Sequence, residues 1–219
     1  MRSSMEVAGD TITDFVAFVN RNPISPSIVV LLTTVLIAQL LALQISEELF
    51  SFLFVAQLRL DFGLFFAPLS HAAFLLHFVP NVLLFLLFGW AIESVLSRKE
   101  FLVVTIAAAY IPTYMHMVYS YITVGTVGTL GFSGVVYALP PIYVALFVQN
   151  YREIQNPLQF GVFWGAVVLT LMIPLSLVGI IDLDGVLPGA WMTHAGGFAI
   201  GMIFSLVKFE LEACAVFKR

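Results

Sequence analysis

The chain has 219 residues, of which 61% are hydrophobic and only 10% are charged, and its mean hydropathy is +1.03. Soluble globular domains carry about 25% charged residues, so this composition excludes an ordinary soluble protein and indicates a single membrane domain. The net charge of -4 and the pI near 5.4 leave no basic patch for phosphates, which excludes a nucleic-acid partner. The single cysteine, Cys214, excludes an internal disulfide and a cysteine-based metal cluster.

Residues 1–27 are expected to form a cytoplasmic N-terminal segment. Within it, the helical spacing of apolar residues from Thr11 to Val19 predicts a short interfacial helix, although a disordered tail explains the pattern nearly as well. Residues 208–219 are expected to form a cytoplasmic tail.

Between these ends, residues 28–207 contain six apolar runs, each near the 20 or so residues that a membrane-spanning helix needs. The runs are Ile28–Ile45, Ala72–Ala91, Phe101–Tyr119, Phe132–Val148, Phe160–Ile181 and Ala190–Val207. The connection from Glu47 to Ser70 is interrupted by charges, glycine and proline but is rich in phenylalanine and leucine, so we expect a partly embedded loop. The sequence therefore predicts an all-α membrane protein with a six-transmembrane-helix bundle.

The distribution of basic residues predicts the orientation of this bundle. Eight of the nine Lys and Arg residues fall in the N-terminal segment, the second and fourth loops or the tail, and only Arg59 falls on the other side. By the positive-inside rule both termini are cytoplasmic. We expect a multi-pass protein of the plasma membrane, in contact with the lipid bilayer.

Three polar positions then lie at a similar depth. His77, Ser133 and His194 fall within the first turn or two of the second, fourth and sixth predicted spans, which all run inward from the exterior. Each residue alone is explained by an ordinary hydrogen bond between helices. Their matched depth favours one water-accessible catalytic site, because polar groups inside a membrane are costly and usually functional.

The residue types match nucleophilic catalysis by a serine. Ser133 begins a helix whose first N–H groups and dipole favour negative charge, and His194 is the candidate base for its hydroxyl. His77 and Asn81, four residues apart on one helix face, can donate hydrogen bonds to an oxyanion. Tyr137, one turn after Ser133, can stack on the ring of His194.

Other features of these runs complete the predicted site. Gly197 and Gly201 share one face of the last span and allow close helix packing next to His194. Asp182 and Asp184 lie in the preceding loop rather than beside His194, so we expect a dyad without a carboxylate. The His-Glu-x-x-His zinc motif does not occur in the sequence, and no metal or cofactor is expected.

Three motifs, whose order along the chain is also that of the family, resemble the rhomboid family of intramembrane serine proteases. They are Gly131-Phe132-Ser133-Gly134 with Tyr137, the pair His77 and Asn81, and His194-Ala195-Gly196-Gly197 with Gly201. The resemblance covers the second to sixth spans. It implies a six-helix core, Ser133 as nucleophile, His194 as base, and an oxyanion site formed by His77, Asn81 and the backbone of Ser133. It also implies that the substrate is a transmembrane segment of another membrane protein.

The chain also departs from the family pattern. Pro140 and Pro141 are expected to kink the fourth span below Tyr137. The segment from Asp182 to Gly189 can form a lid over the site, and Pro174 can loosen the fifth span, although turn chemistry accounts for both nearly as well.

Two other functions remain open from the sequence. A catalytically inactive rhomboid-like protein would bind membrane helices without cleaving them. A small transporter or channel would use the polar groups for transport, but the sequence shows no inverted repeat of the kind that transporters often have.

Overall fold

The computed structural model describes residue 17 and residues 19–125, 128–148, 157–177 and 191–216. Within these residues the protein is helical, and the only β-type pairing described is an isolated antiparallel bridge between Ala56 and Thr129. The predicted interfacial helix at Thr11–Val19 lies almost entirely outside the described residues. The predicted lid from Asp182 to Gly189 lies wholly outside them.

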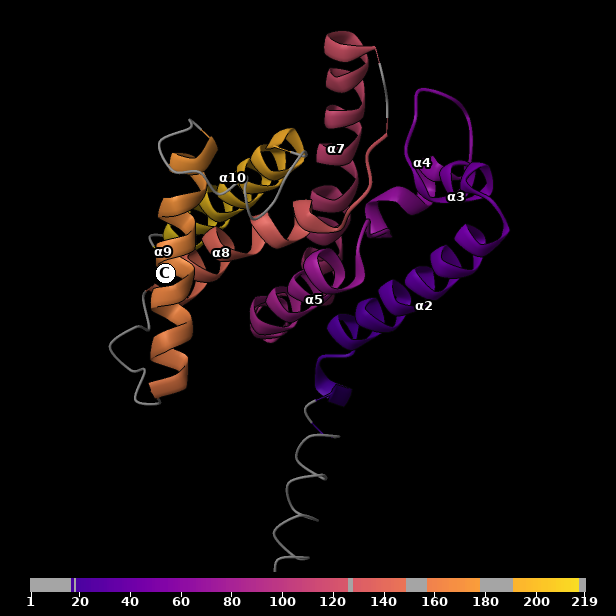
Figure 1. Cartoon of the computed structure of the whole chain (residues 1–219). Coiled ribbons are helices and arrows are strands. Elements are labelled where there is room, and N and C mark those ends of the chain that lie inside the picture. The colour runs from indigo at the N-terminus through magenta and orange to yellow at the C-terminus, as the bar shows by residue number, and fades with distance from the viewer. Residues whose placement is uncertain (1–16, 18, 126–127, 149–156, 178–190, 217–219) are drawn as a thin grey trace, which may run out of the picture.

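The helices follow the order of the predicted apolar runs (Figure 1). Their bounds are α2 Ile24–Ile45, α3 Glu47–Phe54, α4 Gly63–Phe66, η1 Ala67–Leu69, η2 Phe74–Phe78, α5 Val79–Leu84, η3 Phe85–Gly89, α6 Trp90–Glu93, α7 Arg98–Val124, α8 Ser133–Phe147, α9 Pro157–Leu177 and α10 Trp191–Val216. Elements η2, α5, η3 and α6 follow one another without a break and form one helical rod.

Three described segments are long and apolar enough to cross a membrane: Ile24–Ile45, the rod Phe74–Glu93, and Arg98–Thr123. Two further apolar helices, Ser133–Phe147 and Gln159–Leu175, are shorter. The protein is therefore an all-helical integral membrane protein. Helices α3, α4 and η1 occupy the connection between the first two of these segments, where the sequence predicted a partly embedded loop.

Several helices extend beyond the apolar runs that predicted them. Helix α7 begins at Arg98 because Ser97 and Glu100 form a capping box, and it ends at Val124, before Gly125, which adopts a φ of 68°. Helix α10 continues past Val207 to Val216, and Lys208 on it pairs with Glu100 of α7 at 2.8 Å. Hydropathy finds the apolar part of a helix, whereas caps and ion pairs decide where the helix ends.

Prolines alter the helices without ending them. The rod between Phe74 and Glu93 contains two π-helical turns, η2 and η3, on either side of α5. Pro80 near the start of α5 cannot donate the usual backbone hydrogen bond, which accounts for a local change from α-helical pairing. Helix α8 continues through Pro140 and Pro141 to Phe147, so neither proline interrupts it.

Helix α8 is the centre of the bundle. Its residues from Ser133 to Val136 and from Ala138 to Tyr143 are all buried. Helices α7, α9 and α10 pack against it, together with η3, and Figure 1 shows α8 passing between α5 and the α7/α10 pair. The core contains large rings such as Phe85, Phe101 and Phe132, all under 2% exposed.

One long-range contact fixes the start of α2. Glu93 at the end of the rod is 5% exposed, and its carboxylate accepts hydrogen bonds from the backbone N–H groups of Ile24 and Ser25 at 2.7 and 2.8 Å. The first N–H groups of a helix have no partner within the helix and carry its positive dipole end, so a carboxylate is well suited to them. Glu93 thus caps a helix almost seventy residues away.

We expect Glu93→Gln to lower the stability of the fold. Glutamine keeps the size but directs an N–H₂ group at one of the two backbone donors, and losing a charged hydrogen bond costs about 2 kcal/mol. For a protein of this size that corresponds to a fall in melting temperature of roughly 4–8 °C, measurable by thermal unfolding in mild detergent. The control is Glu48→Gln at an exposed position of α3, where the loss should stay below about 1 kcal/mol. Equal losses in both variants would contradict a capping role for Glu93.

Candidate active site

Ser133 is the first residue of α8 and follows a short turn at Gly131 and Phe132. Gly131 has a φ of 144°, a conformation that only glycine adopts readily. The Ser133 side chain is 4% exposed. Its Oγ lies 3.1 Å from Nε2 of His194 on α10, which is hydrogen-bonding distance.

Glycines allow the helices that carry these two residues to approach closely. A Cβ on Gly197 would lie 2.1 Å from the backbone oxygen of Gly134, and one on Gly201 would lie 2.3 Å from that of Ala138. Gly134 itself leaves no room for a side chain, because its Cβ would lie 2.4 Å from the oxygen of Ala108 on α7. The backbones of α7, α8 and α10 therefore meet within one turn of Ser133.

Tyr137 holds the ring of His194 in a fixed plane. The two rings are parallel within 3°, and their centroids are 4.1 Å apart. Because Tyr137 lies one turn after Ser133 on α8, the same helix carries the hydroxyl and the surface on which the imidazole stacks.

His77 lies in the π-helical turn η2, and its ring is close to Gly131 in the turn before Ser133. Its Nδ1 accepts a hydrogen bond from the backbone N–H of Ala72 at 3.0 Å, so in the neutral ring Nε2 carries the proton. This Nε2 edge faces Gly131: a Cβ there would lie 3.0 Å from Nε2 of His77 and 3.7 Å from Oγ of Ser133. The missing side chain of Gly131 leaves room for a small group between the His77 donor and the Ser133 hydroxyl.

Asn81 is buried, at 6% exposure, in the next turn of the rod. Its Nδ2 has no hydrogen-bond partner within the described residues. Buried amide groups are usually paired, so Asn81 is a candidate donor, on the same helical rod as His77, to an acceptor outside the described residues.

The first loop supports the turn before Ser133. The backbones of Ala56 and Thr129 exchange hydrogen bonds at 2.9 and 3.3 Å, and the N–H of Gly131 donates to the oxygen of Ala67 at 2.8 Å. The loop is in turn held by α7, where Tyr110 and Tyr114 donate to the backbone oxygens of Phe65 and Leu64 at 2.9 and 2.6 Å.

A second support comes from a residue that sequence reasoning missed. Gln39 on α2 is 1% exposed. Its side chain accepts from the N–H of His71 at 3.0 Å and donates to the oxygen of the same residue at 3.2 Å. The His71 ring stacks edge-on against His77 at 5.1 Å, and burial, with a smaller contribution from His77, lowers the pKa of His71 to about 3. The sequence signal for this contact was a glutamine in the middle of an apolar run, which by itself names no partner.

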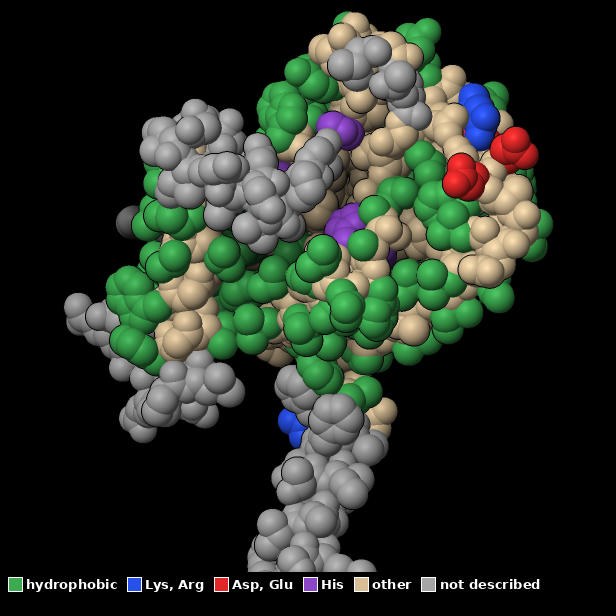
Figure 2. Space-filling view, in the orientation of Figure 1, with side chains coloured by type: hydrophobic (Ala, Val, Ile, Leu, Met, Phe, Trp, Pro, Cys, Tyr) green, Lys and Arg blue, Asp and Glu red, His purple; other side chains and the backbone are tan. Residues whose placement is uncertain are grey.

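Other polar groups lie close to the pair of Ser133 and His194. His116 is buried on α7, which packs against the helix that carries His194. Figure 2 shows histidine side chains near the centre of one face among many hydrophobic ones, with the few charged groups at the margin. No cluster of three or more potential metal ligands occurs among the described residues.

A family model for the Rhomboid domain matches residues 59–211, which is more than half of the chain. A search of the curated proteins found no match. The helical fold, the membrane-spanning segments and this match define an integral membrane protein of the rhomboid class. The chain belongs to the rhomboid family, whose members are generally intramembrane serine proteases that act on transmembrane substrates in the bilayer.

We expect Gly197→Ala to force α8 and α10 apart and to lower stability by about 1–3 kcal/mol, as overpacking of a tight contact usually does. Thermal unfolding in mild detergent measures the effect. Gly165→Ala on α9 is the control, because nothing lies within 4 Å of its Cβ position and alanine is the better helix former by up to about 1 kcal/mol. A Gly197→Ala variant as stable as the Gly165→Ala variant would contradict the close contact.

Proposed function

We propose that this protein is an active intramembrane serine protease that cleaves transmembrane segments of other membrane proteins with a dyad of Ser133 and His194. The observation that carries the proposal is the 3.1 Å distance between Oγ of Ser133 and Nε2 of His194. A nucleophile and its base must lie within hydrogen-bonding reach of each other, and here two helices from distant parts of the sequence meet that condition.

In the proposed reaction the Ser133 hydroxyl gives its proton to Nε2 of His194 as Oγ attacks the scissile carbonyl carbon. The tetrahedral intermediate collapses when the C–N bond breaks, and His194 passes the proton to the leaving amine. Water, deprotonated by His194, then attacks the acyl-enzyme ester, and the proton returns to Ser133 Oγ as the acid product leaves. Tyr137 keeps the imidazole plane in place through both halves.

We assign three donors to the oxyanion of that intermediate. They are Nε2–H of His77, Nδ2 of the buried Asn81, and the backbone N–H of Ser133 at the N-terminus of the fifteen-residue helix α8. Such donors act on charge that develops only in the transition state, so they lower the barrier without tightening substrate binding. Gly131 leaves the space that the oxyanion needs.

We also propose the topology that this reaction requires. The described apolar helices, including the shorter α8 and α9, form with α10 a domain of six membrane spans over residues 28–207, with both termini in the cytoplasm and the dyad near the exterior face of the plasma membrane. The segments 1–27 and 208–219 then flank the domain on the cytoplasmic side. The location of Arg98, Lys99 and Lys208 at the opposite helix ends from Ser133 and His194 supports this orientation.

The arrangement favours catalysis over the two other functions. An inactive relative that only binds helices needs neither a paired serine and histidine nor a buried amide without a partner. A transporter needs a polar path across the membrane, whereas the close contacts of Gly134, Gly197 and Gly201 leave no room between α7, α8 and α10 beside the dyad.

The decisive experiment is cleavage of a generic transmembrane substrate by the purified protein in liposomes. We expect Ser133→Ala and His194→Ala each to reduce the rate by at least about 10³-fold, as loss of a nucleophile or base does in serine proteases. A fluorophosphonate probe should label the wild type but not Ser133→Ala. Equal product from all three proteins, or labelling that survives Ser133→Ala, would refute the dyad.

The oxyanion donors make a separate prediction. Asn81→Leu keeps the number and branching of the side-chain heavy atoms but removes the donor, and we expect kcat to fall by roughly 10²–10³-fold with KM nearly unchanged. The control is Thr170→Val on α9, whose hydroxyl bonds only to Ala166 of its own helix, and it should keep wild-type kcat. If Asn81→Leu instead raised KM at constant kcat, Asn81 would bind the substrate rather than the transition state.

A further inference from the structure

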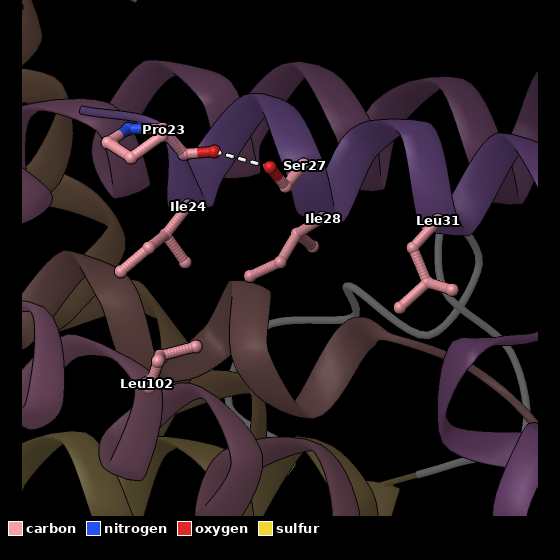
Figure 3. Close-up of a pocket in the computed structure, with 6 residues that line it drawn as sticks. All are labelled: Pro23, Ile24, Ser27, Ile28, Leu31 and Leu102. Atoms are coloured by element: carbon pink, nitrogen blue, oxygen red, sulfur yellow. Dashed lines mark hydrogen bonds between the residues drawn. The ribbon is translucent and has the colours of Figure 1, made fainter. Parts of the chain in front are cut away.

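A groove lies between the first two turns of α2 and the beginning of α7. These helix ends are remote from the dyad. Its volume is about 260 Å³. The lining residues are Pro23, Ile24, Ser27, Ile28, Leu31 and Leu102 (Figure 3). Figure 3 shows Ile24 and Ile28 pointing from α2 toward Leu102 of α7.

The groove has the chemistry of a site for a hydrocarbon chain. Ser27 is the one lining residue with a polar side chain, and its hydroxyl donates to the backbone oxygen of Pro23 at 2.6 Å. The hydroxyl is therefore already paired locally, at the start of α2. The remaining walls are aliphatic. From Ile24 to Leu31 the wall follows α2 for roughly 10 Å at 1.5 Å per residue. Both helices belong to the segments long and apolar enough to cross a membrane, so lipid is the solvent at this surface.

Positive charge gathers at one end of the groove. Arg98 and Lys99 lie four and three residues before Leu102, which places both about one turn away on the same side of α7. Arg21 is exposed two residues before Pro23. Each of the three basic residues is exposed, and within the described residues none of them takes part in an ion pair.

The acidic groups that the structure describes nearby are already engaged. Glu100 pairs with Lys208 at 2.8 Å and accepts from the Ser97 hydroxyl at 2.7 Å. Glu93 is buried against the backbone N–H groups at the start of α2. The basic residues at the groove end therefore remain available to an anion.

We propose that this groove binds one acyl chain of an anionic phospholipid, with the phosphate of its headgroup held by Arg98 and Lys99 and assisted by Arg21. The aliphatic walls take the chain, and the exposed cations at the membrane–water boundary select negative charge. A partner helix fits less well, because a spanning helix needs about 30 Å of contact and the groove follows α2 for about a third of that length. The proposal does not depend on proteolytic activity.

Native mass spectrometry of the purified full chain in detergent tests the proposed phospholipid site. The protein is mixed with equal amounts of phosphatidylglycerol and phosphatidylcholine that carry identical acyl chains. We expect the wild type to retain phosphatidylglycerol at least five-fold over phosphatidylcholine. The double variant Arg98→Gln with Lys99→Gln should lose most of this preference but still bind lipid, because the apolar walls are intact.

Variants that fill the groove test whether the lipid binds there rather than on the rest of the lipid-facing surface. Leu102→Trp should reduce the retained lipid several-fold, and Leu31→Trp on the opposite wall should do the same. Both positions are partly exposed, at 40% and 44%, so the added ring need not disturb the core. The matched control is Val103→Trp, the next residue of α7, which is 58% exposed and does not line the groove; it should bind lipid like the wild type.

Three results would overturn the proposal. The first is equal lipid retention by Leu102→Trp and Val103→Trp. The second is a preference for phosphatidylglycerol that survives the double variant. The third is displacement of the lipid by millimolar inorganic phosphate, which would assign the basic cluster to a free anion rather than to a membrane phospholipid.

Discussion

The close backbone contact of α8 with α7 and α10 is the constraint on which the rest of the structure depends. There is no room for a side chain at Gly134 or Gly197, because a Cβ on either would lie within 2.5 Å of a backbone oxygen on the neighbouring helix. Packing at this distance fixes the relative rotation and height of the helices, because neither can slide without a clash. The separation of Ser133 and His194 is therefore set by the backbones, and the parallel stacking of Tyr137 adds the orientation of the ring.

The opposite wall of the site is built from groups that bond to backbone atoms of irregular segments. Gln39 pairs with both polar backbone groups of His71, Tyr110 and Tyr114 hold the first loop, and Gly131 bonds to Ala67. An unpaired backbone group in an apolar medium is costly, so non-helical chain at membrane depth requires such partners. The loop can then serve as a rigid support for the turn before Ser133.

The sequence predicted the order and type of the helices because apolar runs of this length have few alternatives in a membrane. The depth argument also grouped His77, Ser133 and His194, and the structure places the last two in hydrogen-bonding contact. Periodicity did not reveal that Gly134 contacts Ala108, since a glycine beside a serine has several explanations. The Gln39 contact with His71 and the Glu93 cap on α2 join residues far apart in the chain, and a single sequence carries no signal for such pairs.

The carboxylates Glu93 and Glu100 at one end of the bundle and the amide of Asn81 at the other differ in whether they have hydrogen-bond partners. At the end with Glu93, Glu100 and Lys208, each of these charges has a partner, so those groups stabilise the fold. At the dyad end, by contrast, the buried amide of Asn81 has no partner among the described residues. Leaving such a donor unpaired costs about 1–3 kcal/mol, and in the proposed reaction the oxyanion of the transition state would supply the acceptor. The unpaired amide of Asn81 therefore supports the proposed chemistry at the dyad end, whereas Glu93 and Glu100 stabilise the fold through the partners they already have.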